Sequence, residues 1–200
     1  MNLRFLGDAL DYWKGSLFFR LQREGILIDF LVDQMLTDPK DWRESDFQLY
    51  ADLLQIRRGQ ILQHKRKLKE EREQYFTEVT HTGDLFLDPD TGITLRYTSR
   101  IERYIKISEI CQLLRGNLPR ILCIYQHIRG KKTKDRVTAL VSAIGKSGAK
   151  VYCCSYQTPT VAMLFISARQ NRIKPVYEYF KNYLGRHSSG MRVAVMLDVT

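Results

Sequence analysis

The chain has 200 residues, of which 44% are hydrophobic and 27% charged, an ordinary composition for one well-cored globular domain. It carries 32 Lys and Arg against 22 Asp and Glu, which gives a formal net charge of +10. No apolar run approaches the ~20 residues of a membrane-spanning helix, and Asp8 interrupts the first segment before a signal-like apolar core forms. We therefore expect a cytoplasmic protein without a membrane span. The excess of positive charge favours DNA or RNA as a partner.

Strand-like and helix-like patterns alternate over residues 3–33. Residues 3–7 form a short apolar run that reads as a strand, and Asp8 follows it where its side chain can cap a helix. Residues 10–23 carry apolar side chains close to the i, i+3, i+4, i+7 spacing of an amphipathic helix. Residues 26–32 are mostly apolar and β-branched, as in a strand buried on both faces, and the run ends at Asp33.

Residues 37–80 are expected to form a charged helical insertion. Within it, residues 45–55 predict a short helix, and residues 60–78 predict a longer one with few apolar positions. Lys65 and Arg66 lie in this second helix, where basic side chains spread around more than one face. They could contact a nucleic-acid backbone, and a solvated helix surface is the equally open alternative.

The central strand is predicted at residues 84–87, and it ends in Asp88-Pro89-Asp90-Thr91-Gly92. Further strands are expected at residues 120–125, 150–156, 161–168 and 192–197, and helices at residues 107–115, 134–146 and 173–184. The strands at 150–156 and 161–168 are joined by four residues, short enough for a hairpin. The four cysteines, none in a C-x-x-C pair, are expected to be reduced and buried: Cys111, Cys123, Cys153 and Cys154.

This alternation predicts one α/β domain over residues 1–200. The expected architecture is a Rossmann-like three-layer sandwich, with a mainly parallel sheet and a C-terminal antiparallel hairpin. In such sheets ligands bind outside the carboxyl ends of the strands. Polar residues at predicted strand ends should therefore meet at one edge: Asp8, Asp33, Asp88, Asp90, Gln126 and His127.

Three carboxylates at this edge suit a divalent cation. Asp8, Asp88 and Asp90 could hold Mg²⁺, which prefers oxygen ligands and keeps several waters, and such an ion could activate water against a phosphodiester. Alternatively, the Asp-Pro-Asp-Thr-Gly sequence is a surface turn, since these residues favour turns, and Asp8 only caps a helix.

Basic and titratable residues follow the strand at 120–125. His127 has a side chain whose usual pKa lies near neutrality, so it could act as a general acid or base, although it could also be an ordinary loop residue. The basic loop after it would neutralise several phosphates, unless it is a solvated run of charge. Its members are Arg129, Lys131, Lys132, Lys134 and Arg136.

The second half of the chain, residues 84–197, resembles the C-terminal half of class I Rossmann-like methyltransferases. The Asp88-Pro89-Asp90 element is also similar to the D-P element of the three-cysteine-motif partner proteins. The resemblance implies S-adenosylmethionine as a cofactor, with Asp88 and Pro89 near a target base. The first half departs from the family, because no glycine-rich turn follows Leu6-Gly7-Asp8.

Three functional hypotheses result. The first is a Mg²⁺-dependent nuclease, in which Asp8, Asp88 and Asp90 hold the metal and His127 assists proton transfer. The second is a methyltransferase-like protein, and the third is a non-catalytic nucleic-acid-binding or assembly subunit, with a homo-oligomer or a partner protein as further possibilities. The sequence lacks G-x-G-x-x-G, G-x-x-x-x-G-K-[ST], H-E-x-x-H and G-x-S-x-G motifs, which argues against NAD binding, P-loop nucleotide binding, zinc-protease activity and hydrolases with a serine nucleophile elbow.

Overall fold

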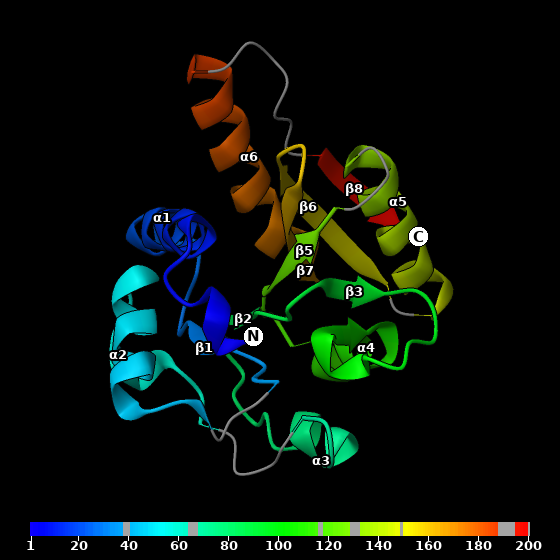
Figure 1. Ribbon diagram of the computed structural model, residues 1–200. Helices are drawn as coiled ribbons and strands as arrows, with labels where there is room; N and C mark the ends of the chain where they lie inside the picture. The colour runs from blue at the N-terminus through cyan, green and yellow to red at the C-terminus, as the bar shows by residue number, and fades with distance from the viewer. Residues whose placement is uncertain are drawn as a thin grey trace.

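A six-stranded sheet lies at the centre of the molecule, in the order β1-β2-β5-β7-β6-β8 (Figure 1). The computed structural model describes residues 1–37, 41–63, 68–115, 118–128, 133–148, 150–187 and 195–199, with side chains described as far as residue 184. The strands of this sheet are β1 (Leu31–Asp33), β2 (Leu85–Leu87), β5 (Leu122–His127), β6 (Val151–Gln157), β7 (Val161–Ser167) and β8 (Val195–Val199). Two further strands, β3 (Gly92–Thr94) and β4 (Tyr104–Lys106), pair in parallel outside it.

The helices of the described residues are α1 (Ala9–Arg23), α2 (Glu44–Leu53), α3 (Arg72–Thr77), α4 (Ile107–Leu113), α5 (Thr133–Lys146) and α6 (Gln170–His187). Short 3-10 turns span η1 (Leu3–Phe5), η3 (Arg58–Gln60) and η4 (Ile101–Arg103). None of the helices within the described ranges combines the length and the apolar character that a membrane crossing requires.

The predicted α/β class is confirmed, and the sheet is mixed. Strands β1, β2 and β5 are parallel neighbours, with Leu31 opposite Leu85 and Leu85 opposite Leu122. Strand β7 pairs antiparallel with both β5 and β6, so the β6–β7 pairing predicted from the sequence is present. Strand β7 lies between β5 and β6 in the sheet. Strand β8 pairs antiparallel with β6 and forms the edge of the sheet opposite β1.

Helices pack against both faces of the sheet, because alternate side chains of each strand point to opposite faces. In β5, Cys123 and Tyr125 join an apolar cluster with α1, α2 and α6. Leu122 and Ile124 of the same strand join a second cluster with α3, α4 and α5, which also contains Ile93 of β3. Figure 1 shows the same arrangement, with α1 and α2 on one side of the sheet and α4 and α5 on the other.

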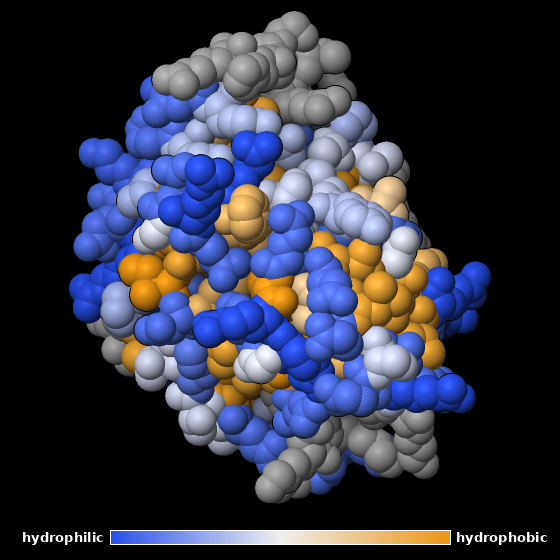
Figure 2. All heavy atoms as spheres, turned by 90° about the vertical axis from the view of Figure 1, so that its left-hand side faces the viewer, coloured by the Kyte–Doolittle hydropathy of each residue, from blue (hydrophilic) through white to orange (hydrophobic). Residues whose placement is uncertain are grey.

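Helices α1 and α2 lie unusually close together at Gly15. A Cβ atom at this position would collide with the backbone carbonyl of Leu53 in α2, so the approach requires glycine. This contact brings the first half of α1, which carries Lys14, beside Tyr50 of α2. The face formed by these helices is mostly hydrophilic, with apolar side chains in separate groups (Figure 2).

The amino-terminal end of β2 is fixed by Asp84, which is 1% exposed. Its Oδ1 atom accepts a hydrogen bond from the Ile121 amide (2.7 Å), and its Oδ2 atom accepts from the Ile28 amide (2.7 Å). The Arg172 guanidinium of α6 also donates to Oδ2 (2.7 Å). Asp84 therefore joins the starts of the parallel strands to α6.

Two predictions for local structure are wrong. Residues 3–7 do not form a strand, because the Asn2 side chain accepts a hydrogen bond from the Arg4 amide and starts the 3-10 turn η1. The long helix expected over residues 60–78 is also absent from the described part, where only Arg72–Thr77 is α-helical. Here Ile61 instead forms a bridge with Val32, next to the edge strand β1.

Three of the four cysteines are buried free thiols, as expected. Burial raises the pKa of Cys153 to about 12, and it raises the pKa values of Cys123 and Cys154 well above their usual range. Cys111 is also free, but it is partly exposed. The three buried thiols stay protonated at neutral pH and are poor nucleophiles.

Candidate functional site

A cavity of about 220 Å³ lies at the carboxyl ends of β2 and β5. Asp8, Asp88, Asp90 and His127, all predicted from the sequence, are among the residues that line it. The remaining lining residues come from the start of the chain, from α1, from the turn after β2, from η4 and from β5: Met1, Phe5, Leu10, Asp11, Lys14, Pro89, Thr91, Arg103 and Tyr125. We call this space the Asp88 cavity.

A buried ion-pair network forms one wall of the Asp88 cavity. The Lys14 ammonium donates to Asp88 Oδ2 (2.8 Å) and to Asp11 Oδ1 (3.0 Å), and it lies 4.7 Å from the centroid of the Tyr125 ring. Lys14, Asp88 and Asp11 are 5%, 2% and 1% exposed. Burial alone would lower the pKa of Lys14, but the two carboxylates raise it above its usual value. The ammonium is therefore charged, and it holds α1 to the end of β2.

Tyr50 of α2 completes this network. Its hydroxyl donates to Asp88 Oδ2 over 2.6 Å, so the same carboxylate oxygen accepts from both Tyr50 and Lys14. Burial and the nearby charge of Asp88 raise the pKa of Tyr50 well above its usual value, which keeps the phenol protonated as a donor. Burial raises the pKa of Asp11 above its usual value, because this effect exceeds the opposing effect of the Lys14 charge.

The turn after β2 is pinned by the side chain of Gln126. Its Oε1 atom accepts from the Ile93 amide (2.7 Å), and its Nε2 atom donates to the Thr91 carbonyl (3.3 Å). Gly92 has φ = +119°, and a Cβ atom there would lie 2.5 Å from Gln126 Oε1. A glycine is therefore required by both the backbone conformation and the close approach of Gln126.

His127 lies at the last position of β5 and lines the cavity. Its amide donates to the Thr91 carbonyl (2.9 Å), and its Nε2 atom lies 3.0 Å from the Tyr125 hydroxyl. The two rings are arranged edge to face, with centroids 5.0 Å apart. These contacts fix the orientation of an imidazole whose chemistry suits proton transfer near neutral pH.

The other two predicted carboxylates are engaged differently. Asp8 caps α1, because its Oδ1 atom accepts from the amides of Leu10 (2.8 Å) and Asp11 (3.2 Å). Asp90 lies 3.5 Å from the amino group of Met1, which also donates to the backbone carbonyls of Gln34 and Met35.

The residues predicted to bind Mg²⁺ do not fit a divalent cation as they are paired here. Asp8 serves as a helix cap, Asp88 already accepts from an ammonium and a phenol, and Asp90 is paired with an amino group. Among the described residues, no three His, Cys, Asp or Glu side chains are grouped so that they could hold a metal. The magnesium site therefore stays a prediction.

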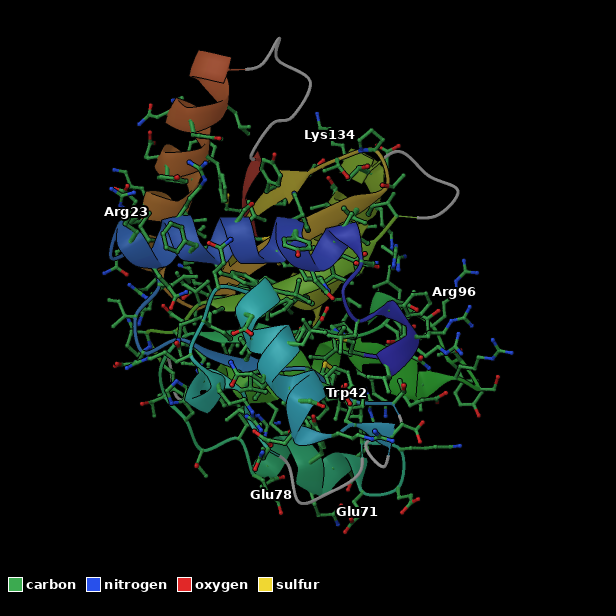
Figure 3. All side chains as sticks on the ribbon, turned by 60° about the vertical axis from the view of Figure 1, so that its left-hand side comes forward. Arg23, Trp42, Glu71, Glu78, Arg96 and Lys134 are labelled. Carbon is green, nitrogen blue, oxygen red and sulfur yellow. The ribbon has the colours of Figure 1, made fainter. Side chains whose placement is uncertain are left out.

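The predicted basic residues are only partly described. Arg129, Lys131, Lys132, Lys65 and Arg66 lie outside the described residues. Lys134 is exposed on the first turn of α5, and Arg136 is half-buried and donates to the Ile93 carbonyl (3.0 Å). Figure 3 shows Lys134 and Arg96 on the side of the molecule opposite Arg23.

Three residues of the site were not singled out from the sequence. Lys14 interrupts the apolar stripe of α1, and a lysine at such a position can indicate a buried ion pair. Tyr50 lies in the short helix predicted over residues 45–55, where nothing in the sequence distinguishes it from the other apolar positions. Arg103 reaches the Asp88 cavity because its carbonyl accepts from the Thr91 amide (2.9 Å), a contact that no local pattern predicts.

Comparison with known proteins does not identify a family for this chain. No protein-family model matches the sequence, and the curated proteins include no significant match. The function is therefore inferred from the chemistry of the Asp88 cavity and its surroundings.

Proposed function

We propose that this protein acts on nucleic acid at the Asp88 cavity and cleaves phosphodiester bonds there. One observation carries the proposal: His127, Arg103 and carboxylates line one cavity at the carboxyl ends of parallel strands. Ligands bind at this edge in α/β sheets. The formal net charge of +10 favours a polyanionic substrate, and binding should weaken as salt increases.

The residues of the cavity divide into chemical and supporting roles. Arg103 would neutralise the charge of a phosphate oxygen, and His127 would accept a proton from the attacking water or donate one to the leaving oxygen. Lys14 and Tyr50 have a supporting role, because both are buried and donate to Asp88. They hold the turn that carries Pro89 and Asp90 against α1.

A cleavage assay on the full chain tests this proposal. Labelled single-stranded DNA, duplex DNA and RNA are incubated with the protein in Mg²⁺, in Mn²⁺ and in EDTA. His127→Ala should slow cleavage by about 10²- to 10⁴-fold, as expected for the loss of a general acid or base. Arg23→Ala, on an exposed and distant part of α1, is the matched control for Arg103→Ala.

Two results would reject cleavage at this cavity. One is the absence of cleavage in every condition, and the other is cleavage that His127→Ala and Arg103→Ala leave unchanged. Salt-sensitive binding without cleavage would instead favour the non-catalytic binding subunit. Dependence on Mg²⁺ that Asp90→Asn abolishes would restore the metal hypothesis.

A methyltransferase-like function is the second candidate. It includes the proposal that the fold is a Rossmann-like three-layer sandwich. Both are supported by helices on the two faces of the sheet and by Asp88-Pro89 directly after the parallel strand β2. The loop after β1 begins Gln34-Met35 and has no glycine as far as Thr37. Calorimetry with S-adenosylmethionine decides this point, since undetectable binding would remove the candidate.

A further inference from the structure

A second hollow, of about 390 Å³, lies beside the Asp88 cavity. It is formed by the segment that joins β3 to β4 and by the first turns of α5, and it includes Arg96, Tyr97, Tyr104 and Arg136. None of these four residues has a role in the proposed cleavage reaction. We call it the Tyr97 hollow.

Tyr97 is held away from the body of the protein. Its side chain is 97% exposed, more than any other large hydrophobic or aromatic residue among those described. The surrounding turn is ordered by its own hydrogen bonds: Thr94 Oγ1 accepts from the Arg96 amide (3.2 Å) and donates to the Arg96 carbonyl (2.7 Å). The Arg100 amide donates to Thr98 Oγ1 (3.2 Å) on the other side of Tyr97. A fixed turn therefore presents a free aromatic face.

Two arginines line the same hollow as Tyr97. Arg96 is exposed, and Arg136 is half-buried and oriented by the Ile93 carbonyl. Within the described part of the chain neither forms an ion pair with a carboxylate. Burial and the charge of Arg96 both lower the pKa of Arg136, while Tyr104 opposes them. Two neighbouring cations without an anion form a favourable place for phosphate groups.

Strands β3 and β4 connect the surroundings of the Asp88 cavity to those of the Tyr97 hollow. Thr91 and Arg103 line the cavity, and each lies next to one of these strands. The register pairs Gly92 with Tyr104 and Thr94 with Lys106. This strand pair follows Thr91 and Arg103 of the cavity, and its Thr94 and Tyr104 line the hollow. A polyanion that occupies the hollow would extend toward Arg103 without leaving the surface.

We infer that the Tyr97 hollow binds single-stranded nucleic acid and directs it toward the Asp88 cavity. A base stacks on Tyr97, and Arg96 and Arg136 contact the adjacent phosphates. Single strands are selected because base pairing in a duplex hides the base faces that stacking requires. The inference rests on the proposed function for the direction of the strand, but the binding itself can be tested separately.

The test is fluorescence anisotropy of the full chain with labelled oligonucleotides of about twelve nucleotides, a length within the range of about 4–16 nucleotides that single-strand binders cover. Oligo-dT and oligo-U separate DNA from RNA, a duplex tests strand selection, and EDTA limits cleavage. Tyr97→Ala should weaken binding of single strands by about 5- to 150-fold, and Tyr97→Phe, which keeps the ring, by less than about twofold. Arg96→Ala should reduce the slope of log K against log salt by about 0.7.

Two variants provide matched controls. Tyr12→Ala removes a tyrosine that is 62% exposed and lines neither the Asp88 cavity nor the Tyr97 hollow. Arg23→Ala removes an exposed arginine far from Arg96 (Figure 3). Neither control should change the affinity for single strands by more than about twofold.

The outcomes separate this inference from the proposed function. If the wild type binds single strands and Tyr97→Ala changes the affinity by less than about twofold, the inference is overturned. The proposed cleavage with His127 as general acid or base would be unaffected by this result. Preference for the duplex would overturn it as well. Reduced binding in Tyr97→Ala without any cleavage by the wild type would support the hollow and reject the nuclease. No binding of any oligonucleotide would reject both.

Discussion

Replacing Lys14 with methionine tests whether the ion-pair network supports the Asp88 cavity. Methionine has a similar length and no charge, so it removes the ammonium that lies between two carboxylates. Asp88 and Asp11 would remain 3.0 Å or less from where the charge had been, with exposures of 2% and 1%. Tyr50 would still donate to Asp88, but no cation would compensate the two buried charges.

We expect Lys14→Met to lower the free energy of unfolding by about 3–5 kcal/mol, the usual cost of leaving a buried charge without its partner. A domain of this kind has about 5–15 kcal/mol of stability in total, so the effect should be obvious. Replacing all three charged residues, Lys14→Met with Asp11→Asn and Asp88→Asn, should recover most of the loss. Neutral groups of similar size often substitute for a buried ion pair with little cost.

The pH dependence of the Lys14→Met variant has a defined sign. Without the ammonium, burial raises the folded-state pKa of Asp11 further above its unfolded value, so the folded protein binds more protons than the unfolded chain between these two pKa values. The stability of the variant should therefore increase as the pH falls from 7 toward about 5. It should decrease as the pH rises through the raised pKa of Asp11. In the wild type, burial already raises the pKa of Asp11, and Lys14 partly opposes this effect.

Urea unfolding followed by circular dichroism measures these differences, with m-values compared to confirm that the folded states are similar. Lys174→Met, at an exposed position of α6, is the control and should change stability by less than about 0.5 kcal/mol. A loss below about 1 kcal/mol for Lys14→Met, or a loss that is the same at pH 5 and pH 7, would refute a charged buried pair.

Three further predictions concern the scaffold. Gly92→Ala should cost about 1–3 kcal/mol in urea unfolding, because of its positive φ and its approach to Gln126, whereas Gly59→Ala, where a Cβ meets nothing within 4 Å, should be nearly neutral. Asp84→Ala should cost about 3–5 kcal/mol by the same measurement, and an unchanged midpoint would contradict its role. A thiol reagent should modify only Cys111 in the folded protein and all four cysteines in urea; rapid modification of more thiols would contradict their burial.

Much of the framework could be predicted because buried strands have a strong local signal. Continuous apolar runs located β2, β5, β6 and β7, and the rule that ligands bind at strand carboxyl ends brought Asp88, Asp90 and His127 to one cavity. Asp8 reached the same cavity for a different reason. It follows a 3-10 turn rather than a strand, and it lies there because it caps α1.

The rest depends on contacts between distant parts of the chain. Strand order has no local signature, so the return of β7 between β5 and β6 could not be read from the sequence. Strands β3 and β4 have three residues each, too short to show a period, yet their pairing delivers Arg103 to the Asp88 cavity. The close contact at Gly15 likewise places Tyr50 beside Asp88 without any pattern in α2.

The position of Lys14 also bears on the chemistry that Asp88 can perform. Asp88 Oδ2, which accepts from an ammonium and a phenol, is a poor base, since both contacts stabilise the charged form of the carboxylate. In the proposed reaction the reactive groups are therefore His127 and Arg103, which line the same cavity. Their character suits a phosphate more than a metal ion, and the cations of the Tyr97 hollow extend the same preference along the surface. In the proposed function, the turn at Asp88-Pro89-Asp90 is a buried support for the residues that would bind phosphate, and the metal site stays a prediction.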